Sequence, residues 1–168
     1  MVTMTDAGPF MNTPTPRRVT LLRRCAVPAN IFFLIGVPLA WLTLRFVTGA
    51  AGWFVIIYLL GGVILFAAQF ILVIVMTRSK RHTPDGYPPQ GAAVWSYVSA
   101  LFHVATALSL DDFGDVEGAF HSYVSSATNP NIGFTVFAIC ALIAILAYLL
   151  SLISAVRAMM GTKSSIHR

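Results

Sequence analysis

Hydrophobic residues are grouped along the chain into four long apolar segments, separated by short polar or charged connections. The segments run over about residues 26–44, 51–76, 92–110 and 132–156. Each is close to the roughly 20 residues that an α-helix needs to cross a hydrocarbon core about 30 Å thick. The pattern predicts an all-α integral membrane protein with four transmembrane helices in a compact bundle.

The remaining segments divide the chain around this membrane domain, which occupies residues 26–157. Residues 1–25 are rich in proline, threonine and arginine and predict a mobile basic tail. Residues 158–168 form a short C-terminal tail, and residues 111–131 form the longest loop. No segment outside the apolar ones has the size of an ordinary soluble domain.

Charge is distributed unevenly over these connections. Arg45 is the one residue among the eleven lysines and arginines that does not lie in the N-terminal tail, the connection between the second and third spans, or the C-terminal tail. Loops rich in lysine and arginine stay cytoplasmic. We therefore expect both termini in the cytoplasm of a plasma membrane, most simply a bacterial inner membrane, with the basic ends against an anionic inner leaflet.

A cleavable signal peptide is the main alternative for the first span, with residues 31–44 as its apolar region and cleavage near Ala50. Arg45 stands where such a site needs small residues, and Pro38 interrupts the apolar region. We therefore retain the span, with Pro28 near its first turn and a kink at Pro38.

Aromatic residues lie near the predicted boundaries of the spans. Trp41, Phe46 and Trp53 surround the outer end of the first hairpin, and Trp95 and Tyr97 lie near the inner end of the third span. Amphipathic rings prefer the depth of the lipid headgroups, so these positions support the boundaries.

The two longer connections predict different structures. Residues 82–91 are dense in turn-forming residues and predict a short, stiff link between the second and third spans. The outer loop has apolar residues at helical spacing and predicts a short amphipathic helix at the membrane surface. These residues are Val116, Ala119, Phe120, Tyr123, Val124 and Ala127.

The same outer loop holds the acidic residues of that side together with a histidine. They are Asp111, Asp112, Asp115, Glu117 and His121. Their order does not match a calcium-binding EF-hand loop. We interpret them as a solvated acidic surface that can contact a basic partner, and we expect no bound metal.

Polar residues form a stripe along the third span. They are Ser96, Ser99, His103, Thr106 and Ser109. Groups of this kind lack partners in lipid, so the stripe should face other helices or water. His103 lies near the middle of the membrane and is a functional candidate by default, although a structural hydrogen-bonding role, with Gln69 as the obvious partner, is the simpler interpretation.

The fourth span carries small residues at heptad spacing, and we call them the small-residue seam. They are Cys140, Ala144, Ala147, Ser151, Ser154 and Ala158. Small residues at this period allow another helix to approach closely. The seam fits packing within the bundle, a homo-oligomer or docking onto another membrane protein.

Catalytic and cofactor motifs are absent from the sequence. A bis-histidine haem would need a second histidine within the membrane, and the two cysteines, Cys25 and Cys140, lie in different parts of the chain. We expect no cofactor, no nucleic-acid binding and no enzymatic activity. The favoured function is an accessory, assembly or stabilising subunit of a larger respiratory or transport complex. The alternative is a small oligomeric channel or transporter lined by the polar face around His103.

Overall fold

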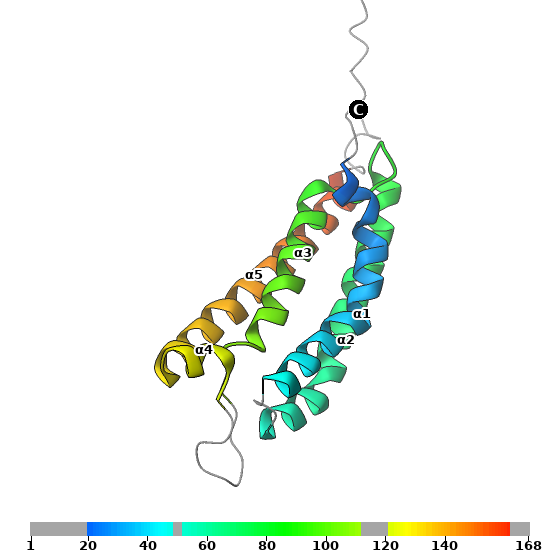
Figure 1. The fold of residues 1–168 in the computed structure, drawn as a ribbon. Helices are drawn as coiled ribbons and strands as arrows, with labels where there is room; N and C mark the ends of the chain where they lie inside the picture. The colour runs from blue at the N-terminus through cyan, green and yellow to red at the C-terminus, as the bar shows by residue number, and fades with distance from the viewer. Residues whose placement is uncertain (1–19, 49–51, 112–120, 162–168) are drawn as a thin grey trace, which may run out of the picture.

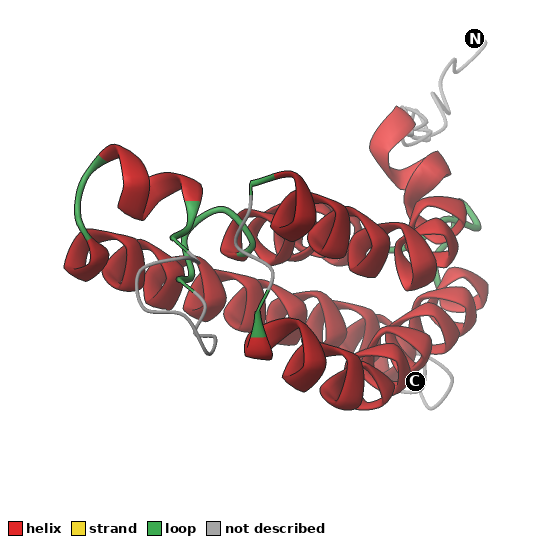
Figure 2. Ribbon diagram, turned by 60° about the horizontal axis from the view of Figure 1, so that its bottom comes forward, coloured by secondary structure: helices red, strands yellow, loops and turns green. Residues whose placement is uncertain are grey.

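The computed structural model describes residues 20–48, 52–111 and 121–161 (Figure 1). Within these residues the chain contains helices and connecting segments and no strand, as Figure 2 shows. The all-helical prediction is confirmed for this part of the chain. In chain order the elements are α1 (Leu21–Val47), α2 (Trp53–Ser79), the 3₁₀ turn η1 (Lys80–His82), α3 (Gln90–Thr106), α4 (Tyr123–Ala127) and α5 (Pro130–Gly161).

Three helices in the described part of the chain are long and apolar enough to cross a membrane. They are α1, α2 with its η1 extension, and α5. Only 17%, 17% and 22% of their most apolar windows are buried inside the protein. Their outward surfaces are therefore apolar and unshielded, as expected for helices that are surrounded by lipid.

Helix α3 is shorter than the predicted third span. It contains 17 residues, or about 25 Å at 1.5 Å per residue, which is less than a hydrocarbon core of about 30 Å. After Thr106 the chain tightens, and the backbone N–H groups of Ala107 and Leu108 donate to carbonyls three residues earlier, at 3.0 and 3.1 Å. A fourth transmembrane helix therefore stays a prediction.

Helix α1 begins before the expected start of the first span. It includes Leu21 and Arg23, and it continues through Pro28 and Pro38 to Val47. Pro28 therefore lies in the interior of the helix and not in its first turn. Pro38 has no N–H to donate to the carbonyl of Leu34, one turn earlier.

The four long helices form a ring of two hairpins. Helices α1 and α2 make one hairpin, and α3 and α5 make the other; the main contacts between hairpins join α1 to α3 and α2 to α5. The start of α1 and the end of α5 lie at the same end of the bundle (Figure 1). After the predicted orientation, we call this end the inner end and the opposite end, which carries α4, the outer end.

The small-residue seam of α5 packs against α3 within the chain. Cys140, Ala144, Ala147 and Ser151 are buried, whereas Ser154 and Ala158 are half-buried. Two hydroxyl groups fix the contact. Ser99 Oγ donates to the carbonyl of Ala144 at 2.9 Å, and Ser151 Oγ donates to the carbonyl of Ala92 at 2.8 Å.

An ion pair fastens α1 to the connection between α2 and α3 at the inner end. The guanidinium of Arg23 contacts both carboxylate oxygens of Asp85, at 2.6 and 2.8 Å. Its Nε donates to the carbonyl of Pro88 at 2.7 Å. This hydrogen-bonded guanidinium lowers the pKa of the Asp85 carboxyl group. The turn-rich connection is therefore held by a residue from another helix.

Candidate functional site

A fully buried amide joins three helices near the inner half of the bundle. Asn30 of α1 donates from Nδ2 to Ser96 Oγ of α3 at 2.9 Å and to the carbonyl of Ala26 at 2.7 Å. Its Oδ1 accepts a hydrogen bond from Gln69 Nε2 of α2, also at 2.9 Å. Both amide hydrogens and the amide oxygen therefore have partners, as a polar group inside a membrane requires.

His103 is paired with an aromatic hydroxyl of α2. Its Nε2 lies 3.0 Å from the hydroxyl of Tyr58, and the two rings meet edge to face. The Tyr58 ring stacks on Trp41 with 3.9 Å between centroids and 9° between planes. His103 therefore pairs with Tyr58 and not with Gln69 as expected, and the Gln69 amide nitrogen donates to Asn30.

The same cluster continues to the outer end through Trp41. Trp41 Nε1 donates to Thr106 Oγ1 at 3.0 Å, and the Arg45 guanidinium carbon lies 5.4 Å from the centroid of the Trp41 ring. Arg45 is fully buried, and its Nη1 donates to the carbonyl of Leu110. Arg45 is therefore part of the interior, and the Trp41 ring, which is 3% exposed, is covered by protein.

Beside this cluster lies a cavity of about 220 Å³ to which all four long helices contribute. Most of its wall is apolar. The polar residues that line it are Gln69, Ser99, His103 and Tyr148. The Tyr148 hydroxyl donates to the carbonyl of Ala68 at 2.7 Å, which ties α5 to α2 at the edge of the cavity.

The polar stripe of α3 faces protein, as expected, but its members have different partners. Ser96, Ser99, His103 and Thr106 contact α1, α5, α2 and α1 respectively. Ser109 follows the end of α3, and its Oγ contacts carbonyls of the last turn of α3 at 3.4 Å. The structure brings only Ser99, His103 and Gln69 of the predicted polar path to the cavity.

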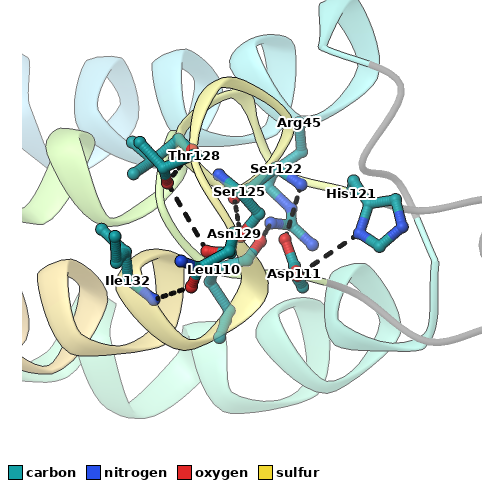
Figure 3. Close-up of polar contacts among 10 residues, drawn as sticks. Arg45, Leu110, Asp111, His121, Ser122, Ser125, Thr128, Asn129 and Ile132 are labelled. Atoms are coloured by element: carbon teal, nitrogen blue, oxygen red, sulfur yellow. Dashed lines mark hydrogen bonds and ion pairs between the residues drawn. The ribbon is translucent and has the colours of Figure 1, made fainter.

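At the outer end, Asp111 closes the connection to α4 (Figure 3). Its Oδ1 accepts a hydrogen bond from the Ser122 backbone N–H at 2.7 Å, and its Oδ2 lies 3.5 Å from His121 Nδ1. Burial raises the pKa of Asp111, but hydrogen bonds from Ser122, Ser125 and His121 outweigh burial, so the net pKa is lowered. The carboxylate is thus held in its charged form.

The predicted amphipathic helix is only partly within the described residues. Helix α4 covers Tyr123–Ala127, and Ser122 Oγ accepts from the Ser125 backbone N–H at 3.2 Å as its N-terminal cap. Val116, Ala119 and Phe120 lie outside the described residues, as do Asp112, Asp115 and Glu117 of the acidic cluster.

Neither a metal nor a redox pair is indicated where the structure describes the chain. No three His, Cys, Asp or Glu side chains gather there in a way that could hold a metal ion. Cys25 is exposed, Cys140 is buried, and both are free thiols.

Sequence reasoning missed four residues of the site: Asn30, Trp41, Tyr58 and Arg45. Asn30 could have been predicted from the sequence, because an amide inside an apolar segment needs a hydrogen-bonding partner. Arg45 follows Trp41 by one helical turn, a spacing that places a cation beside a ring. Tyr58 gave no signal, since its partner lies 45 residues away in the sequence.

Comparison with known proteins gives no family assignment. No protein-family model, no curated protein and no solved structure matches this chain.

Proposed function

We propose that this chain is a small non-catalytic membrane protein that acts as an accessory, assembly or stabilising subunit of a larger membrane complex. The described polar side chains of the helix interior support this proposal, because they join helices to one another. A bundle whose helices are joined by hydrogen bonds suits a structural subunit, because such a subunit presents a fixed surface to the other proteins of the complex.

Two adjacent glycines in the middle of α2 carry the proposal. A Cβ atom added at Gly61 or Gly62 would meet nothing within 4 Å, so the fold itself does not require glycine there. Their neighbours Leu60, Val63 and Ile64 are 74–76% exposed. Glycine costs a helix about 1 kcal/mol relative to alanine, yet it lets a second membrane helix approach closely. We propose that a transmembrane helix of another protein packs on this glycine face.

Replacing Gly62 with leucine should therefore disrupt the complex without unfolding the subunit. We expect Gly62→Leu to reduce recovery of the co-purifying membrane protein about tenfold, as loss of a close-packed contact worth 1–2 kcal/mol would. The measurement is quantitative mass spectrometry after affinity purification from native membranes in mild detergent.

The matched control is Ala138→Leu, which adds bulk to an exposed position of α5. Recovery that is unchanged in Gly62→Leu, or equally reduced in Ala138→Leu, would contradict the proposed glycine face. If only a second copy of this chain co-purifies, the glycine face is a homo-oligomer contact and not a contact with another protein.

We further propose that both termini are cytoplasmic and that the membrane is a plasma membrane of the bacterial type. Arg23 at the start of α1 and Arg157 near the end of α5 lie toward the same end of the bundle as the basic segment at the end of α2. Because these basic residues lie at a single end of the bundle, we propose that this end faces an anionic inner leaflet.

One observation favours the channel or transporter alternative, namely the cavity that Ser99 and His103 line. If the protein conducts protons or small polar solutes, flux into liposomes should fall to background in His103→Ala. It should be kept in Thr77→Ala, which changes an exposed hydroxyl of α2. The absence of flux from the unmodified protein would remove this alternative.

A further inference from the structure

The cavity between the two hairpins combines an apolar wall with a neutral polar corner. Among the described residues that line it there is no Asp, Glu, Lys or Arg. A charged headgroup would therefore lose its hydration without gaining a counter-charge. The volume of about 220 Å³ exceeds that of an engineered apolar cavity of about 150 Å³ that binds benzene. The space thus suits a neutral group of about the size of a substituted ring.

Two polar atoms at this corner have hydrogen-bonding capacity that the described protein does not use. Gln69 donates from Nε2 to Asn30, but no described residue donates to its Oε1. His103 contacts Tyr58 through Nε2, and its Nδ1 has no described partner. Neither atom is fully enclosed by the described protein, and both residues line the cavity.

A hydroxyl group can satisfy either atom. It can donate to Gln69 Oε1, which only accepts. It can also accept from His103 Nδ1–H. Nδ1 carries the proton when the Tyr58 hydroxyl donates to Nε2. A carbonyl or an ether offers no donor to Gln69 and would leave its oxygen unsatisfied.

The wall of the cavity reaches the lipid-facing surface between α2 and α5. Leu65, Phe66 and Ile145 line the cavity, and these side chains are 37%, 49% and 59% exposed. A molecule dissolved in the bilayer can therefore reach the polar corner sideways, without crossing an aqueous phase.

We propose that this cavity binds a neutral, lipid-soluble molecule that carries a hydroxyl group, with its hydroxyl donating to Gln69 and its apolar body against α2 and α5. This inference is independent of the glycine face proposed above. A structural subunit that failed to bind any partner through α2 could still bind such a molecule.

The test uses a photoreactive phenol, with a trifluoromethyl-diazirine as the reactive group, and the same compound without its hydroxyl. The purified full chain in lipid nanodiscs is irradiated with each compound, and labelled residues are mapped by mass spectrometry. We expect the phenol to label cavity-lining residues of α3 and α5. Labelling should exceed that by the hydroxyl-free compound about tenfold, the difference expected for a hydrogen bond made away from water.

Two alanines provide the variants. Ala100→Leu fills the cavity and should abolish the labelling there, whereas Ala138→Leu on the exposed surface of α5 should leave it unchanged. Thermal unfolding of each variant establishes that it is folded. Equal labelling by both compounds would mean an apolar void without a hydroxyl site. Labelling spread over all lipid-facing residues and unaffected by Ala100→Leu would also overturn the proposal. The comparison of the two compounds is made on the unmodified protein, so it does not depend on the folding of any variant.

Discussion

Gly133→Ala is expected to be the most destabilising alanine substitution at a glycine of the described bundle. A Cβ at this position would collide with Ser125 Oγ and would lie 3.1 Å from the carbonyl oxygen of Ser109. The hydroxyl can rotate away, but the carbonyl belongs to the backbone after α3 and cannot move alone. We expect a loss of about 2–3 kcal/mol in the free energy of unfolding, as for overpacking of a tight core.

The measurement is thermal unfolding of the purified protein in detergent, followed by circular dichroism. Gly62→Ala is the matched control, because the same methyl group would meet nothing there, and we expect its midpoint to stay equal or rise slightly. Removing the Ser125 hydroxyl should recover part of the loss, so Gly133→Ala combined with Ser125→Ala should unfold at a higher temperature than Gly133→Ala alone. Equal midpoints for Gly133→Ala and Gly62→Ala would contradict the close contact between α4 and α5.

Asn30→Leu is expected to have the second largest effect. Leucine branches at the same carbon but carries no polar atom, so the change removes the hydrogen bonds that join α1 to α2 and α3, and its larger side chain adds overpacking. It also leaves the Gln69 amide in an apolar environment with only the more distant backbone carbonyl of residue 30, at 3.4 Å, as an acceptor. Single hydrogen bonds in membrane proteins contribute about 0.6 kcal/mol on average and up to about 1.7, so the three-helix node should contribute about 2 kcal/mol.

The same unfolding measurement tests this expectation, with Asn131→Leu as its control. Asn131 is exposed in the first turn of α5, and its side chain makes no hydrogen bond within the described protein. In addition, Ser96→Ala should cost less in the Asn30→Leu background than in the unmodified protein, because the two side chains share one hydrogen bond. Additive effects of the two changes would show that the node does not act as a unit.

The sequence predicts the long helices well because their signal is local. Continuous apolar runs predict α1, α2 and α5. The turn-rich residues 82–91 predict the connection before α3, which in the structure is shorter, because η1 ends at His82 and α3 begins at Gln90. The end of α3 is less predictable. The apolar pattern continues to Leu110, but hydrogen bonds after Thr106 shift to a tighter spacing that composition does not encode. Local hydrophobicity thus predicts which residues form helices better than it predicts where a helix ends.

The candidate site is harder to predict because its pairs are distant in sequence. Periodicity correctly places Ser96, Ser99 and Thr106 against other helices, since lipid offers them no partner. It cannot decide between Tyr58 and Gln69 as the partner of His103, because both lie in α2 and the choice depends on helix rotation and register. Arg45 illustrates the same limit. A charge at the end of an apolar run suggests a boundary, and only the position of Leu110 shows that it is buried.

The buried Arg45 and the inner Arg23 together impose an order on biosynthesis. Both cations of α1 bind groups that the ribosome adds much later, since Asp85 and Leu110 follow them by 62 and 65 residues. While only the first hairpin has been made, neither guanidinium has these ligands. The contacts of both guanidinium groups with Asp85 and Leu110 are therefore complete only after the chain has been made as far as Leu110.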